Sequence, residues 1–367
     1  METNASQQVG NAQEKELQNE TAGVGGLVKT AEDILTEDGL KKSVRNVGEK
    51  FRNFTGTERL EGFSIRELFA EVFKKHTVDE VERCFTVGTP ETVPEVKDLD
   101  TTWPRPWMFF RALFGSAVVY FLFVWAWDMF ENLNLIPGLI MTGSMAIPLA
   151  TTLFFFEMNA RRNVSLYQVV RLVLFGGIVS LVFSLILFEL PLDDLGWLGA
   201  SIAGLVEEPG KLLALIVVAR AAKYRYKLNG LLFGACIGTG FAMFESMGYA
   251  FQILLGEGVK GMNSNILLRG FLSPFGHIVW TSIGGAAIWR VKGAAPFRLS
   301  MVKDGRFWHL FLVPVVLHMI WNADFELPFL GKYIALGVAA WVVVLALIQE
   351  GLKELRDEKV KSTQAVE

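Results

Sequence analysis

The feature that most constrains this chain of 367 residues is a series of long apolar spans that begins at Trp107 and continues to about residue 349. Most of these spans reach the roughly 20 residues that an α-helix needs to cross a hydrocarbon core of about 30 Å. Backbone groups in lipid must be satisfied internally, which favours helices. The composition agrees, with 51% hydrophobic residues, 20% charged residues and a mean hydropathy of +0.36. We therefore predict an all-α, polytopic membrane protein in contact with membrane lipids.

The pattern predicts eight transmembrane helices, at residues 107–127, 135–156, 168–190, 197–219, 229–252, 267–289, 308–322 and 327–349. Basic residues gather after the even-numbered spans, whereas the alternate loops are acidic or mixed. By the positive-inside rule both termini are cytoplasmic, which requires an even number of spans. We therefore expect a multi-pass protein of the cell membrane.

Four regions are predicted along the chain. Residues 1–29 are polar, with little periodicity, and are expected to be disordered. Residues 30–106 form a small cytoplasmic helical region and linker, residues 107–350 the eight-helix transmembrane domain, and residues 351–367 a charged cytoplasmic tail. In the second region, apolar residues from Leu40 to Phe54 repeat at helical spacing between basic residues, which predicts a basic amphipathic helix.

Two capping patterns follow that helix. Ser64 and Thr77 each stand three residues before a glutamate and ahead of apolar residues. This arrangement predicts short helices over residues 65–75 and 78–86.

Charge and cysteine content exclude some classes of partner and site. The formal net charge of -3 provides no overall attraction to nucleic acid, so no nucleic-acid partner is expected. Cys84 and Cys236 are far apart in the sequence. They predict neither a disulfide framework nor a cysteine metal site.

A small set of ionisable and polar residues lies deep inside four of the predicted spans. A charged side chain at the centre of a membrane helix costs about 3 kcal/mol even on a lenient insertion scale. Groups on several helices that all need partners are most simply placed in one polar chamber. The set comprises Glu207, Glu208, Lys211, Glu245, His277, His318 and Asn322.

The segment GLVEEPGKLL, residues 204–213, concentrates this charge on one helix. Lys211 lies three and four residues after the glutamates, so it can neutralise one carboxylate. Glu207 and Glu208 are about 100° apart around a helix and cannot play the same part. Pro209 removes one backbone hydrogen bond, which predicts a kink or partial unwinding at the glutamates.

Several motifs resemble those of the PrsW family of intramembrane proteases, which is related to the type II CAAX prenyl proteases. EEPGK at 207–211 resembles the family's EExxK motif, and FAMFE at 241–245 resembles its FxxxE motif. HIVWT at 277–281 and HMIWN at 318–322 resemble its two histidine motifs. The chain has Ser246 where the family often has asparagine after the second motif. The resemblance covers about 130 residues and implies a membrane-embedded peptidase that cleaves a single-span regulator, such as an anti-sigma factor.

Peptide hydrolysis needs an activated water, a group that stabilises the oxyanion and a proton for the leaving amine. Glu207 or Glu208 is the candidate general base, beside Lys211, and Asn322 is the candidate oxyanion donor. Glu245, His277 and His318 could hold a divalent metal such as Zn²⁺ in a His₂Glu site. The same residues could also position the water without a metal, and the sequence leaves both mechanisms open.

Two other classes of function stay open. A proton-coupled transporter also places carboxylates at the membrane midplane on broken helices. A non-catalytic scaffold of the same fold would keep the polar cluster for assembly. Paired histidines and the lack of matching interrupted spans in the two halves favour the protease.

Overall fold

The computed structural model describes residues 37–191, 193–220 and 223–364, and every regular element in these ranges is a helix. The chain divides into two compact units, and the boundary lies between Phe54 and Thr55. In the first unit, α2 (Glu37–Thr55) confirms the helix predicted from Leu40 to Phe54. The disorder predicted for residues 1–29 lies outside the described residues.

The second unit begins with two short helices. α4 (Val78–Phe85) has a complete capping box, in which Thr77 Oγ1 accepts the backbone N–H of Glu80 and the Glu80 carboxylate accepts that of Thr77. The helix predicted over 65–75 is too long, because α3 (Ile65–Leu68) ends after about one turn. Beyond α3, residues 69–73 continue as turns, in which the N–H of Val72 donates to the carbonyl of Phe69 and the N–H of Lys74 to that of Glu71.

Residues 55–106 are attached to the transmembrane helices by hydrogen bonds. Arg161 donates to the carbonyl of Pro94 at 2.8 Å. Directly after the segment, the Glu157 carboxylate accepts the backbone N–H groups of residues 107–109 at 2.8 to 2.9 Å and so satisfies the first turn of α5 (Met108–Phe130). The Gln349 side chain accepts the backbone N–H of Glu61 and donates to the carbonyl of Arg59. This segment therefore packs on the membrane-spanning part of its unit.

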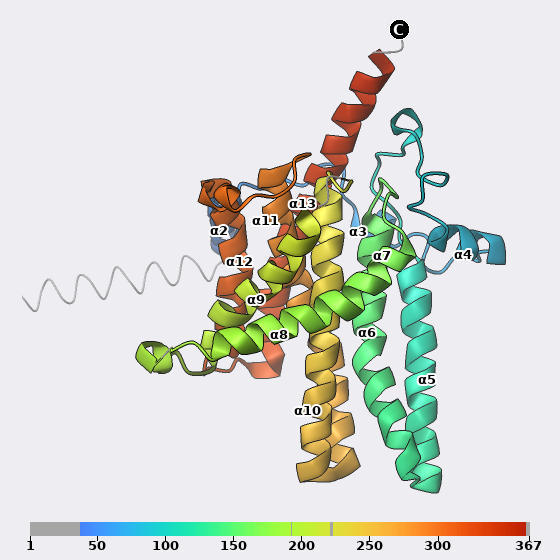
Figure 1. The fold of residues 1–367 in the computed structure, drawn as a ribbon, viewed down its shortest axis with the longest axis vertical. Coiled ribbons are helices and arrows are strands. Elements are labelled where there is room, and N and C mark those ends of the chain that lie inside the picture. The colour runs from blue at the N-terminus through green and yellow to red at the C-terminus, as the bar shows by residue number, and fades with distance from the viewer. Residues whose placement is uncertain (1–36, 192, 221–222, 365–367) are drawn as a thin grey trace, which may run out of the picture. The chain divides into compact units, whose positions relative to one another are not determined.

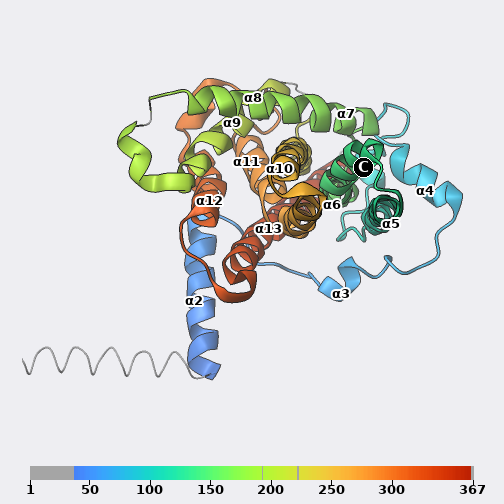
Figure 2. The same cartoon turned by 90° about the horizontal axis from the view of Figure 1, so that it is seen from below.

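α10 lies at the centre of this second unit, in contact with α6, α8, α11 and α13 (Figures 1 and 2). The short 3₁₀ segments connect or cap the longer helices. One turn of π-helix, Leu172–Gly176, joins α7 to α8, so the two helices form one continuous helical segment. The long elements are α5 (Met108–Phe130), α6 (Ile136–Met158), α7 (Leu166–Arg171), α8 (Gly177–Phe188), α9 (Ile202–Ala219), α10 (Lys227–Leu272), α11 (His277–Lys292), α12 (Gly305–Asn322) and α13 (Gly331–Gln364).

Five helical segments of the described chain are long and apolar enough to cross a membrane, namely Met108–Phe130, Leu133–Met158, Leu166–Phe188, Lys227–Lys292 and Pro328–Gln364. The fourth segment contains two of the predicted spans. α9 and α12, which overlap two more, are not among the five. The count of eight spans and the cytoplasmic termini stay predictions.

α10 is a helical hairpin rather than one rod, with its reversal at Gly258. This glycine has φ of 73° and ψ of -171°, outside the helical region. A continuous helix would separate Glu245 from Arg269 by about 36 Å. Their side chains are instead 2.5 Å apart. The reversal therefore returns the second arm of α10 alongside the first.

Glycines set the contact between the first arm of α10 and α11. Gly230, Gly234 and Gly238 are spaced four residues apart and share one helix face. A Cβ atom on Gly234 would overlap the backbone of Thr281, and one on Gly238 would overlap that of His277. Small residues let membrane helices approach closely. This contact fixes the height at which α11 begins, and therefore the height of His277.

Candidate active site

α9 carries three buried ionisable side chains on one stretch of helix. Glu207, Glu208 and Lys211 are 8%, 2% and 1% exposed. The helix is not interrupted at Pro209, so the unwinding predicted there does not occur. Gly210 packs directly on the backbone of Ser184 in α8, and this close neighbour supports the helix on the proline side.

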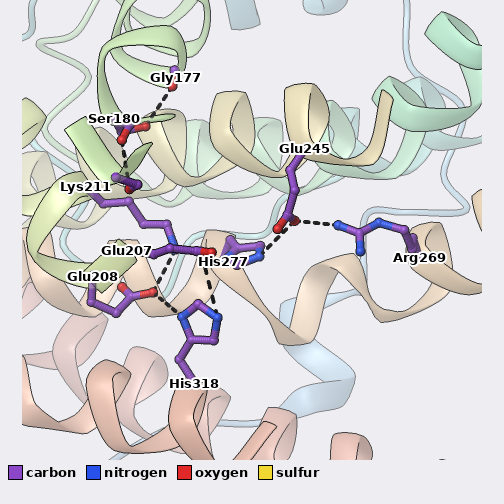
Figure 3. Close-up of polar contacts among 10 residues, drawn as sticks. Gly177, Ser180, Glu207, Glu208, Lys211, Glu245, Arg269, His277 and His318 are labelled. Atoms are coloured by element: carbon purple, nitrogen blue, oxygen red, sulfur yellow. Dashed lines mark hydrogen bonds and ion pairs between the residues drawn. The ribbon is translucent and has the colours of Figure 1, made fainter. Parts of the chain in front are cut away.

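Glu208 is the best-satisfied acid of the cluster (Figure 3). Its Oε1 accepts from Lys211 Nζ at 2.8 Å and lies 2.9 Å from His318 Nδ1. A carboxylate that receives two such bonds holds both partners in place, because charge-assisted hydrogen bonds are short and strong. Glu208 therefore fixes the ring of His318 and leaves the other ring nitrogen, Nε2, to face the cluster.

Glu207 has looser contacts. Its Oε2 lies 3.4 Å from Lys211 Nζ and 3.8 Å from His318 Nε2. The second distance exceeds that of a hydrogen bond. Glu208 makes both of its short bonds through Oε1, whereas the contacts of Glu207 to Lys211 and His318 are longer. Glu207 is thus the less tightly held carboxylate and the more available one for a water or a metal ion.

His277, the first residue of α11, links the two halves of the site. Lys211 Nζ is 2.8 Å from its Nδ1, and Glu245 Oε2 is 3.2 Å from its Nε2. A lysine ammonium donates and cannot accept. We therefore assign Nδ1 as the acceptor and Nε2 as the protonated nitrogen that donates to Glu245. The break at Ser273–Gly276 starts α11 at this residue and aims its ring at α9.

Glu245 is held by a residue that sequence reasoning missed. Arg269, on the second arm of α10, pairs with the Glu245 carboxylate at 2.5 Å and donates to Ser246 Oγ at 3.0 Å. Ser246 therefore accepts from the arginine that holds Glu245. The available signal was a lone arginine within an apolar stretch at the start of a predicted span.

Aromatic rings line the cluster. The Phe241 ring lies 4.1 Å from Lys211 Nζ. Trp280 stacks on His318 with ring centroids 4.5 Å apart. Such rings attract cations and limit the water around them. They keep the ionised groups of the cluster away from lipid.

Six of the seven predicted site residues thus meet in one cluster drawn from α9, α10, α11 and α12 (Figure 3). The seventh, Asn322, is the half-buried last residue of α12, one turn after His318. Within the described part of the chain it makes no hydrogen bond or ion pair to the cluster. The catalytic roles of all seven stay predictions.

Comparison with known proteins assigns the family. Residues 165–348, about half of the chain, match the family described as PrsW family intramembrane metalloprotease. The chain belongs to the PrsW family. The matched range contains all four helices that supply the cluster. This family is one of intramembrane proteases, and the predicted resemblance is confirmed.

One curated relative matches a shorter stretch. The chain is 27% identical over 157 residues to a protein of Aquifex aeolicus (strain VF5) named "Ammonium transporter". The match covers 39% of this chain and 36% of that protein, so the chain spans about a third of the relative's length. No solved structure matches the chain.

The family is described as metalloproteases, and one group of side chains could bind a metal ion. Glu207, His277 and His318 each offer one ligand atom, and these atoms lie within 4.8 Å of one another. The sequence-based set named Glu245 in place of Glu207, and the geometry gives Glu245 a contact with His277 instead.

The donor chemistry fits a divalent metal. Two imidazoles and one carboxylate make a His₂Glu set, as in catalytic zinc sites. The Glu208–His318 bond is the carboxylate–histidine contact that orients metal ligands. The amine of Lys211 contacts His277 Nδ1, so a metal bound at that nitrogen would take the place of Lys211 there.

Proposed function

We propose that this chain is an endopeptidase that hydrolyses a peptide bond in a membrane-spanning regulatory protein, at the cluster of Glu207, His277 and His318. The observation that supports it is the convergence of these three side chains from three helices in one buried group. Burying such groups together is costly. Activation of a water for attack on an amide bond explains why these groups are buried together, whereas side-chain packing alone does not.

Glu207 acts on the water in this proposal. Its carboxylate has unused acceptor capacity and faces His318 Nε2 across 3.8 Å. A water between them would donate to the carboxylate and lose a proton to it as it attacks the carbonyl carbon. The same proton can then pass to the leaving amine.

Glu208 and Lys211 act as positioning residues. Glu208 fixes the ring of His318, and Lys211 is held between both glutamates and His277. The lysine charge keeps two adjacent carboxylates compatible in a buried site. Asn322 remains the proposed oxyanion donor, because it lies one turn beyond His318 on the same helix face.

The metal proposed for the site is Zn²⁺, held by His277, His318 and one carboxylate oxygen of Glu207. The second oxygen of Glu207 would remain available to accept the proton of the water. When bound, Zn²⁺ would polarise the substrate carbonyl and lower the pKa of a bound water. The protein would hold the metal-binding side chains in place. Glu208 orients His318, and Glu245 orients His277.

The substrate and topology are proposed from the family and the sequence. A single-span membrane protein, such as an anti-sigma factor, fits a site made by transmembrane helices, and the distribution of basic loops favours cytoplasmic termini in the cell membrane. The alternative class is transport, for which the partial likeness to a protein named "Ammonium transporter" is the supporting observation. That likeness covers only about a third of the relative, whereas the family match covers the whole cluster.

The test compares wild type with Glu207→Gln, each purified and reconstituted in liposomes with single-span membrane proteins. Mass spectrometry should find new fragments only with wild type. Elemental analysis of the same samples should find about one zinc per chain, and His318→Ala should remove it. Methylammonium uptake that Glu207→Gln abolishes, without any fragment, would instead establish transport. Equal fragments from both proteins would refute the proposed role of Glu207.

A further inference from the structure

A cavity of about 430 Å³ opens beside His277, on the side away from Glu208. Its size lies within the range of ligand pockets, about 300–1,000 Å³. The second arm of α10, the start of α11, the end of α12 and the start of α13 contribute its walls. Large apolar and aromatic side chains dominate the lining, among them Leu268, Leu272, Trp280, Trp321, Leu330 and Tyr333.

Three of the residues that line this cavity carry a buried polar atom without a partner in the described chain. Asn265 Oδ1, Ser273 Oγ and Trp280 Nε1 are buried and form no hydrogen bond with any described residue. They are half of the six buried side-chain atoms without a partner in the described chain. Trp280 is 1% exposed overall, and its ring stacks on His318. Buried groups of this kind are rare, and an unpaired one costs about 1–3 kcal/mol.

The unpaired atoms identify the chemistry of the occupant. A lipid acyl chain would suit the apolar walls but could not satisfy an indole N–H, an amide oxygen and a hydroxyl. A stretch of peptide without helical hydrogen bonds carries unpaired C=O and N–H groups, which are costly in a membrane. Trp280 Nε1 can donate to such a carbonyl, and Asn265 Oδ1 can accept from an N–H.

The rim of the cavity is charged and fixed. Arg269 lies on one side, bound to Glu245 and Ser246. Glu326 lies on another, where it accepts from Tyr333 Oη at 2.8 Å and pairs with Lys332 at 3.4 Å. These pairs hold the rim without occupying the three unpaired atoms inside.

We propose that this cavity is the subsite for an unwound segment of the substrate next to the cleaved bond, with a bulky apolar side chain inside and main-chain groups on Trp280, Asn265 and Ser273. The inference rests on the proposed protease function and extends it to substrate recognition. His277 lines the same cavity, so a peptide bound there lies beside the cluster.

The test uses full-length protein in nanodiscs and a set of synthetic single-span peptides in which one position near the cut carries every residue from glycine to tryptophan. Leu268→Trp fills the cavity. It should lower kcat/KM at least tenfold for bulky residues and shift preference toward glycine and alanine. Leu267→Trp is the matched control, because its neighbouring side chain is similarly exposed and lies outside the cavity. Unchanged preference in Leu268→Trp would overturn the subsite.

Trp280→Phe separates the hydrogen bond from the packing. It keeps an aromatic ring beside His318 but removes the N–H. We expect kcat/KM to fall about tenfold on all peptides, with unchanged side-chain preference. Wild-type rates in this variant would remove Trp280 from the proposal.

A binding measurement keeps the two proposals distinguishable. If neither wild type nor Glu207→Gln yields a fragment, the protease function fails. A photo-crosslinking phenylalanine at position 268 of Glu207→Gln then tests the cavity alone. Peptide crosslinks at 268 but not at 267 support peptide binding, whereas lipid crosslinks, or equal peptide yields at both positions, overturn it.

Discussion

The polar interior of this protein has two sides that differ in how well their groups are satisfied. Around Glu208, every charged group is paired within 3 Å, and the residues are almost fully buried. Around Trp280, in the adjacent cavity, three polar atoms have no partner in the described chain. The first side holds its groups in fixed positions through short bonds, whereas the second has polar atoms whose hydrogen-bonding capacity is unused. Glu207 is intermediate between the two sides, because its contacts to Lys211 and His318 are longer, at 3.4 and 3.8 Å.

The largest effect on cleavage is expected for a substitution of Glu207. Glu207→Gln keeps the shape of the side chain but removes the base, so the cleavage rate should fall at least about 1,000-fold with little change in folding. Fragment formation by mass spectrometry and thermal unfolding in detergent would measure the two effects. A fall below tenfold would place water activation elsewhere.

Glu208→Gln should have a smaller effect on cleavage and a larger one on stability. Loss of the charge weakens the bonds to Lys211 and His318, and outer partners of this kind affect activity about 10- to 100-fold. We expect about 100-fold slower cleavage and a lower midpoint of thermal unfolding. Glu189→Gln, at the exposed end of α8, is the matched control and should behave as wild type. If Glu208→Gln abolished cleavage and Glu207→Gln did not, the two roles would be exchanged.

Arg269→Ala tests the link between the two sides. Glu245 would lose the guanidinium that holds its carboxylate beside His277. We expect about tenfold lower kcat with a smaller change in KM, and partial recovery in Arg269→Lys. Equal loss in both variants, or an effect confined to KM, would show that Arg269 contacts substrate instead of positioning Glu245.

Gly238→Ala should have the smallest effect on activity. The added methyl group meets the carbonyl of His277, so α10 and α11 must separate slightly, which typically costs about 1–3 kcal/mol. Cleavage should slow about fivefold and unfolding should begin at lower temperature. Gly248→Ala, on the same helix with nothing within 4 Å of the added atom, is the control. Similar behaviour of both variants would mean that this contact does not set the height of His277.

Hydropathy predicted the all-helical class, and the cost of buried charge predicted that seven polar side chains from four helices would meet, as six of them do. Both arguments depend on the high cost of exposing polar groups to the hydrocarbon core of a membrane, and neither needs detailed geometry. The partners within the cluster were harder to predict. The separate spans predicted at 229–252 and 267–289 already required the chain to reverse between them. They did not give the position of the turn at Gly258, on which the contact between Arg269 and Glu245 depends.

Local signals succeeded where their hydrogen bonds are local. The capping box at Thr77 is complete within four residues and correctly predicted α4. α3 has the same pattern at its start but ends early, because residues 69–73 form turns instead of continuing the helix. A capping pattern gives the start of a helix and not its length. At Pro209 the local rule predicted unwinding, but the helix continues, supported by its packing on Ser184.

The tip of the α10 hairpin is also suited to chemical labelling. Its tip, Leu255–Gly258, is exposed, and a side chain on Gly256 would meet no atom within 4 Å. The glycines that set the position of His277, Gly230, Gly234 and Gly238, lie on the first arm and contact α11, so this contact does not involve the tip. A cysteine at Gly256 could therefore carry an impermeant thiol reagent without disturbing catalysis, and its labelling in intact cells would report which side of the membrane the tip faces.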